Sequence, residues 1–241
     1  MEKLSEKIKK TNYEKMKTRD AKIKIFRTGL LISLLFLIIV YFLLKVWYSN
    51  GGFTIGIDRG FAKKSGLILF ENMADKNYKI QLDAGKLDYA DNISINWLPQ
   101  NIDTEAEGNH NGSNYLAYTF YIQNMGSDPV NYWYTIYLDA AIKNLDKAIR
   151  VMVIQNNDKI VYAKKAANGE NENGTTQFYA DNIVAIKATK NFKPEQIDKF
   201  TLVVWVEGDD PDCDDSLLGG ETKMHMEITQ EMISDKSNTT D

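Results

Sequence analysis

The sequence contains few of the residues from which most catalytic and cross-linked sites are built. Its 241 residues include one cysteine, Cys213, and two histidines, His110 and His225. A single cysteine excludes a disulfide within the chain, so stability must come from an apolar core. The histidines lack the His-Glu-x-x-His spacing of zinc hydrolases, and no P-loop, Gly-x-Ser-x-Gly elbow or dinucleotide fingerprint is present. We therefore expect both histidines to be ordinary surface residues and the protein not to be an enzyme.

Charge is distributed unevenly along the chain. Residues 1–27 hold eight Lys and two Arg against three Glu and one Asp, a net charge of +6. The whole chain carries −4 at pH 7, which leaves −10 for the remainder. An acidic body offers no positive face for phosphates, which argues against nucleic-acid binding.

An apolar segment separates the basic end from the acidic body. Residues 28–44 carry no charge and approach the length that crosses a bilayer core of about 30 Å. Lys45 can extend its ammonium group to the headgroups, and Trp47 and Tyr48 fit an interfacial aromatic belt. We predict a transmembrane helix over residues 28–48, in contact with the lipid bilayer. Because positive charge precedes it, residues 1–27 are expected in the cytoplasm and the C-terminal domain outside the cell.

A cleavable signal peptide is the alternative reading of the same segment. It too would have a basic region followed by an apolar one. Against it, the basic region is 27 residues long, and no Ala-x-Ala-like cleavage site follows. The pattern favours a permanent anchor.

Residues 49–229 read as one β-rich domain, followed by a polar tail over residues 230–241. Strands are predicted at residues 53–55, 67–70, 78–82, 91–99, 115–124, 130–138, 148–154, 159–163, 200–206 and 222–229. The runs 115–124 and 130–138 are expected to pair as a hairpin, as are 148–154 and 159–163. Short helical segments are expected over residues 139–147 and 192–199. With no βαβ rhythm, the pattern predicts a mainly β fold, an antiparallel β-sandwich of jelly-roll or immunoglobulin-like order.

The segment Glu207–Gly220 is the most unusual stretch of the domain because it concentrates carboxylates. Like charges at this density repel one another unless a cation or solvent relieves them. One interpretation is a calcium site, although the EF-hand spacing is absent; the other is a solvated loop joining two strands. The calcium ligands would be Asp209, Asp210, Asp212, Asp214 and Asp215, beside Glu207. A smaller group, Asp103, Glu105 and Glu107, leaves the same two interpretations open.

Cys213 lies inside this acidic segment. Neighbouring carboxylates raise the pKa of a thiol and make it a poor nucleophile. We expect a free thiol without a catalytic role.

Two stretches resemble a known family. The strand pair NYLAYTFYIQNMG…VNYWYTIYLD and the closing VVWVEGDDPDCDDSLLGGETKMHMEI resemble the exported β-sandwich proteins of Firmicutes, the camelysin and TasA-like biofilm-matrix group. The resemblance covers parts of residues 114–139 and 200–228. It implies a jelly-roll-like domain, display at the cell surface and a structural or matrix role. The metalloprotease activity ascribed to camelysin is not carried over, because no zinc-binding motif is present.

Together these observations predict a non-enzymatic, membrane-anchored surface protein. Its β-sandwich would serve protein–protein contact, adhesion or envelope and matrix assembly, with a protein partner at the cell surface. One alternative is an accessory component of an envelope-spanning secretion or conjugation machine. Another is a metal-dependent surface hydrolase.

Overall fold

The computed structural model describes residues 22–44 and 52–230, which belong to two separate compact units. Residues 1–21, 45–51 and 231–241 lie outside the described parts. Most of the predicted basic tail, the end of the predicted membrane segment and nearly all of the predicted C-terminal tail therefore fall outside them.

The described part of the first unit, residues 22–44, is one helix, Lys22–Leu44, of 23 residues. At 1.5 Å per residue its length is about 35 Å, and its composition is apolar enough to cross a membrane. It includes residues before the predicted start at residue 28, so Lys22, Lys24 and Arg27 belong to the helix. A membrane anchor and a signal sequence both have this length and composition.

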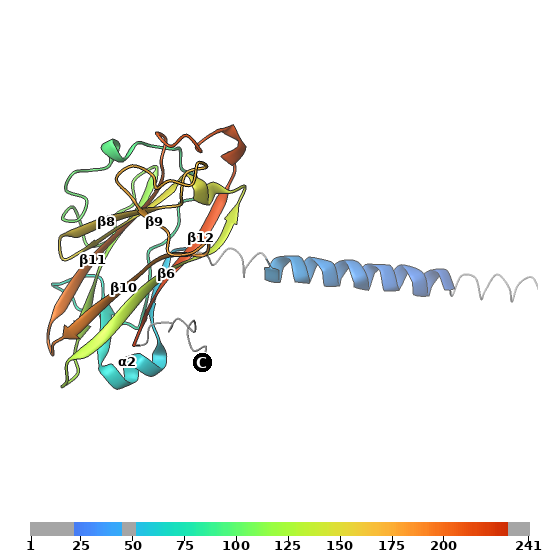
Figure 1. Ribbon diagram of the computed structural model, residues 1–241. Helices are drawn as coiled ribbons and strands as arrows, with labels where there is room; N and C mark the ends of the chain where they lie inside the picture. Colours follow the sequence, from blue (N-terminus) through green and yellow to red (C-terminus); the bar gives the residue numbers. More distant parts are fainter. Residues whose placement is uncertain (1–21, 45–51, 231–241) are drawn as a thin grey trace, which may run out of the picture. The chain divides into compact units, whose positions relative to one another are not determined.

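The second unit is built from two mixed β-sheets (Figure 1). Sheet A has the order β10 (Ile183–Phe192), β6 (Val130–Ile142), β12 (Glu221–Thr229), β1 (Thr54–Ile57) and β3 (Gln81–Asp83). Sheet B has the order β2 (Leu67–Phe70), β5 (Tyr115–Asn124), β11 (Ile197–Val206), β7 (Ile149–Gln155), β8 (Asp158–Ala163) and β9 (Thr176–Gln177). The short strand β4 (Gly108–Asn109) pairs with β5.

The two sheets pack face to face across one hydrophobic core. Tyr134 of sheet A meets Phe200 of sheet B edge to face, with ring centroids 5.5 Å apart, and Phe200 stacks on Phe120 at 5.3 Å. Alternate residues of each strand point into this core, as the two-residue period of a strand requires. Its largest fully buried side chains include Tyr118, Tyr132, Tyr134, Phe120, Phe192 and Phe200.

One helix closes an end of the domain. Helix α2 (Arg59–Ser65) connects β1 of sheet A to β2 of sheet B. The Asp58 side chain caps it by accepting from the Phe61 amide at 2.7 Å, and Gly66 ends it in the left-handed conformation. This helix was not predicted from the sequence.

The strand pairs are nested about one hairpin. Strands β7 and β8 form it through Asn156 and Asn157, both with positive φ, as a tight two-residue turn requires. Moving outward along the chain in both directions, β6 pairs with β10, β5 with β11, and β1 with β12. The predicted hairpin of 148–154 with 159–163 is confirmed.

The other predicted hairpin is wrong. Strands β5 and β6 are consecutive, but β5 pairs with β2 and β11, whereas β6 pairs with β10 and β12. The turn over residues 125–129 therefore carries the chain from one sheet to the other. The expectation of an antiparallel fold is also too simple, because β1 runs parallel to β12 and β8 parallel to β9.

The predicted helix over residues 139–147 is instead the end of a strand followed by a turn. Strand β6 continues to Ile142, since β12 supplies hydrogen-bonding partners as far as Glu221. Only a 3-10 turn, η2 (Leu145–Lys147), follows. Tertiary pairing has overridden the local helical pattern.

Two further local predictions also fail. The strand expected at residues 91–99 is a 3-10 turn, η1 (Ile95–Trp97), with Trp97 75% exposed. The helical turn expected over residues 192–199 is the tight connection between β10 and β11. Strand β10 itself was not predicted.

The outer face of sheet B is covered. Residues 92–110 run across it, and apolar side chains from this segment and from the sheet form a second hydrophobic cluster. We call this surface the covered face; its buried members are Ile93, Leu98, Ile102, Ala117, Met152, Ile154, Val161, Val203 and Trp205.

Candidate functional site

The acidic segment leaves β11 at the rim of the covered face. Glu207 is 7% exposed, and its carboxylate accepts from the Trp205 indole at 3.0 Å and from the Ile95 amide at 3.2 Å. It also accepts from the Asp209 amide at 3.3 Å. These three N–H groups stabilise the charge of the carboxylate, and through them Glu207 holds the loop against the covering segment.

Asp210 is the most deeply held carboxylate of the segment. Its side chain is fully buried, and one oxygen lies 2.5 Å from the guanidinium of Arg150, which is 4% exposed. Its other oxygen accepts from the Asp212 amide at 2.8 Å. Arg150 lies in β7 and alternates with core residues, so it points to the covered face. A buried ion pair therefore joins the acidic segment to sheet B.

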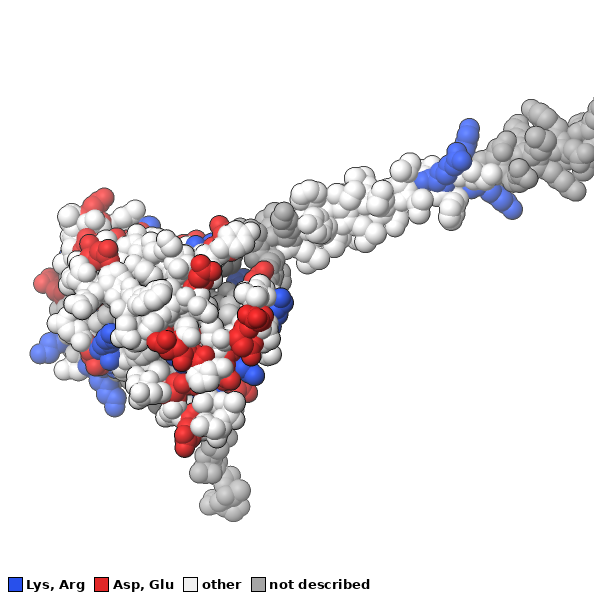
Figure 2. Space-filling view, turned by 90° about the horizontal axis from the view of Figure 1, so that it is seen from above, with Lys and Arg blue, Asp and Glu red and all other residues white. Residues whose placement is uncertain are grey.

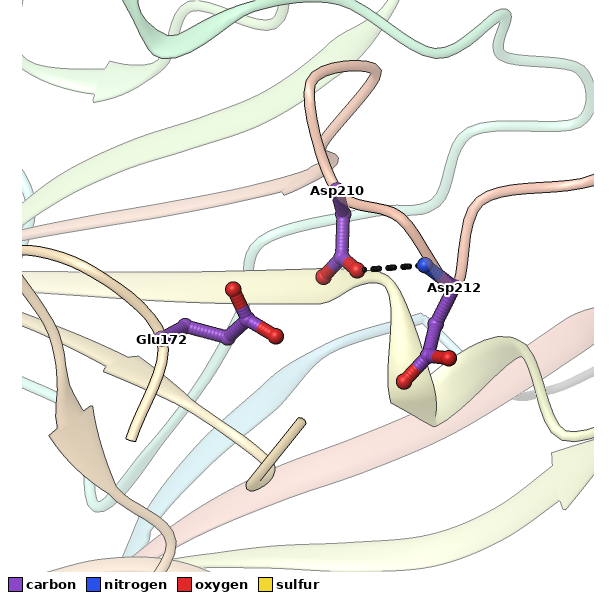
Figure 3. Close-up of side chains that lie close together, drawn as sticks. All are labelled: Glu172, Asp210 and Asp212. Atoms are coloured by element: carbon purple, nitrogen blue, oxygen red, sulfur yellow. Dashed lines mark hydrogen bonds between the residues drawn. The ribbon is translucent and has the colours of Figure 1, made fainter. Parts of the chain in front are cut away.

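Glu172 approaches the same guanidinium from another loop, with an oxygen 3.7 Å from Arg150. Burial raises the pKa of Glu172, and the carboxylates of Asp210 and Asp212 raise it further, while Arg150 opposes them. Glu172, Asp210 and Asp212 bring one carboxylate oxygen each within 4.8 Å of one another (Figure 3). Three oxygens at this spacing could hold a calcium ion, with water completing the coordination.

The other predicted calcium ligands do not join this group. Asp209 accepts from the Ser94 hydroxyl at 2.6 Å, which ties it to the covering segment. Asp214 caps the 3-10 turn η3 (Asp215–Leu217) through the Ser216 amide, and hydrogen bonds from the Ser216 side chain and then from its amide lower the pKa of Asp214. Asp215 is exposed in the first turn of η3. Among the described residues, only Asp210 and Asp212 of the five predicted ligands converge, and Glu172 completes the set.

Glu172 was not predicted as a ligand because it lies in the loop between β8 and β9, far along the chain from the acidic segment. The available signal was Arg150, a charged residue in the middle of the apolar run AIRVMVI. A buried arginine requires a carboxylate partner, and more than one loop can supply it.

Glu107, Cys213 and His110 have structural partners. Glu107 accepts from the Tyr121 hydroxyl at 2.5 Å, and the Cys213 sulfur accepts from the Asn92 amide at 3.2 Å. The ring nitrogens of His110 lie 2.9 Å and 3.1 Å from the carbonyl oxygens of Gly108 and Ile102. His110 is thus half-buried within the covering segment rather than an ordinary surface residue. Figure 2 shows acidic side chains gathered on the loop-bearing end of the domain.

His225 belongs to a different surface, the outer face of sheet A. Its Nδ1 lies 2.8 Å from the Asp139 carboxylate, and its ring stacks on Tyr137 with centroids 4.8 Å apart. We call this surface the open face. It consists of three cross-strand rows: Ile183, Tyr137, His225, Thr54 and Asp83; Ile186, Thr135, Glu227, Gly56 and Gln81; Ala188, Trp133 and Thr229. All of them except Thr135 retain solvent exposure.

Comparisons with known proteins add little to the interpretation of this site. No family model and no curated protein matches the sequence. Among solved structures, a β-glucosidase from Kluyveromyces marxianus, in complex with glucose, is similar to 70% of this chain with 9% identity and a TM-score of 0.26. The similar part spans 16% of that enzyme. At this TM-score the likeness carries no argument about fold or function.

Proposed function

We propose that the protein is a non-enzymatic, membrane-anchored surface module whose β domain makes contacts outside the cell. The observation that carries the proposal is the difference between the two outer faces. The covered face is sealed by residues 92–110, whereas the open face presents rings and polar groups to solvent. A surface left in this state is suited to adhesion or to envelope and matrix assembly.

The helix Lys22–Leu44 supports anchoring in the bilayer, with the basic residues before it held in the cytoplasm. Protease added to intact cells should digest the domain and spare the N-terminal stub. Protection of the domain, or a mature protein that begins near Asn50, would contradict permanent external display. Antibody labelling of an epitope at each end supplies the control for orientation.

A jelly-roll order of the β-sandwich is the finer part of the proposal. The domain has four strand pairs nested about one hairpin. A long two-stranded ribbon that is rolled into two facing sheets has this arrangement. The lateral pairs β6–β12 and β7–β11 then close each sheet. The parallel β1–β12 pair departs from a purely antiparallel ribbon. The camelysin and TasA-like resemblance supports the same order and a matrix role.

Calcium at Glu172, Asp210 and Asp212 remains a second candidate property. The three close oxygens favour it, but Arg150 already supplies a cation to two of the three side chains. A role as an accessory component of a secretion or conjugation machine is tested by deleting residues 1–21 while keeping the helix. If the variant no longer assembles with the machine, the machine role is favoured. If its domain still makes its contacts at the cell surface, the independent module is favoured.

A further inference from the structure

The open face lacks a side chain at Gly56, and we call the space above this residue the floor. This glycine lies inside β1, and its φ is outside the left-handed region, so no turn requires it. A Cβ built at Gly56 would meet nothing within 4 Å. Glycine in a strand costs about 0.5–1 kcal/mol relative to alanine and often marks the close approach of another molecule. Neither the backbone nor the packing of the described domain explains why this position lacks a side chain.

Aromatic rings stand beside this floor. Tyr137 and His225 stack within 18° of parallel in the row next to that of Gly56, and Trp133 lies in the row on the other side. Tyr137 and Trp133 are four residues apart on β6, or roughly 13 Å along the strand. The two rings therefore border a strip long enough for a short oligosaccharide.

Hydrogen-bonding groups lie between and beside the rings. Glu227 and Gln81 are the cross-strand neighbours of Gly56, and Thr54 lies two residues away on the same strand. These groups donate and accept hydrogen bonds without carrying positive charge. The three rows contain no Lys or Arg and hold the carboxylates of Asp83 and Glu227, so the rows themselves do not suit an anionic ligand, and Lys223 lies beyond them on β12.

A second copy of the chain fits the open face poorly. In a two-fold dimer the same patch meets itself. Glu227, Asp83 and the adjacent Asp139 would then bring carboxylates against carboxylates. Like charges across an interface cost several kcal/mol unless they are paired.

We propose that the open face binds a neutral polysaccharide. The C–H faces of its sugar rings would lie on Tyr137 and Trp133, and its hydroxyls would bond to Glu227, Gln81 and Thr54 beside the floor at Gly56. This inference rests on the proposed surface display, because it names the ligand class of the displayed module.

Binding is tested with the full chain in lipid nanodiscs, mixed with particles of cellulose, chitin, xylan and mannan and then sedimented. We expect wild type to be depleted by at least one polymer and released by its soluble oligosaccharide. Gly56→Val and Tyr137→Ala should each weaken retention at least tenfold, while Trp97→Ala, an exposed aromatic outside the open face, should not. Empty nanodiscs give the background.

Gly56→Val guards against misfolding, because its side chain enters open space and valine suits a strand. Its melting temperature should equal or exceed that of wild type. Failure of every polymer to retain wild type, or equal retention of Gly56→Val, would overturn the proposal, as would a wild-type dimer that Gly56→Val disperses. Sedimentation does not depend on membrane orientation, so its failure is distinguishable from failure of surface display, which the protease experiment on cells measures.

Discussion

The two outer faces of the domain are built from strands of the same geometry, but one face is buried and the other is exposed to solvent. On sheet B many outward positions are apolar, as at Ala117, Met152 and Val203, and residues 92–110 bury them. On sheet A many outward positions are polar or aromatic, as at His225 and Glu227, and they stay partly exposed. The outward residues therefore decide whether a face belongs to the core or to the surface. Four predictions test this, in decreasing order of their effect on stability.

Trp205→Ala should have the largest effect, because it empties the middle of the covered face. Trp205 is 2% exposed, and its indole anchors Glu207. We expect a loss of about 4 kcal/mol in the free energy of unfolding. Urea denaturation of the detergent-solubilised chain, followed by circular dichroism, measures it. A loss below about 1 kcal/mol would mean that the cover contributes little.

Arg150→Met should be next, with a loss of about 3 kcal/mol, because it leaves the buried carboxylate of Asp210 and the half-buried carboxylate of Glu172 without their cation. Calcium should restore part of this stability in the variant, since the three carboxylates would then bind the ion instead. In wild type, calcium should leave the melting temperature unchanged. A wild-type shift of several degrees would instead show that the ion binds beside Arg150.

Arg150→Met combined with Asp210→Leu serves as the matched control. This double variant removes both partners of the ion pair, so it should be more stable than Arg150→Met alone. Calcium should have no effect on it.

Glu172→Gln should stabilise the protein by a smaller amount at neutral pH. The pKa of Glu172 is raised in the folded state, so folding favours its protonated form. The cost of ionising it is therefore present above its folded pKa and absent below the unfolded value, about pH 4. The melting temperature of the variant should exceed that of wild type at pH 7, and the two should converge as the pH falls to about 4. A difference that persists at low pH would contradict this assignment.

Tyr137→Ala should change stability least, by less than about 1 kcal/mol, because its ring lies on the open face and packs mainly on His225. The same urea titration measures it beside Trp205→Ala. Equal losses in the free energy of unfolding for the two variants would contradict the difference between the faces, since both would then be parts of the core.

The sequence predicted the strands whose patterns are local. The runs in β5, β6, β7, β8 and β11 and the β7–β8 hairpin follow from β-prone residues and a two-residue Asn turn. The partner of β5 could not be predicted, because the sequence of the turn over residues 125–129 suits two kinds of connection. It could form a hairpin within one sheet or carry the chain from one sheet to the other. The acidic segment was located, but Glu172 comes from a distant loop, and no spacing rule connects it to Asp210.

The position of β12 has a consequence for the order in which the domain can be completed. This strand lies between β6 and β1, so before it arrives sheet A exists only as two separate halves. Its pairing of His225 with Thr54 closes the longest loop of the described fold, a slow step by contact-order reasoning. If the domain is exported as proposed, the chain after the helix crosses the membrane in order, so sheet A is not complete until β12 has emerged. The stretch before β12 would then wait in a partly assembled form, with the edges of β6 and β1 unpaired.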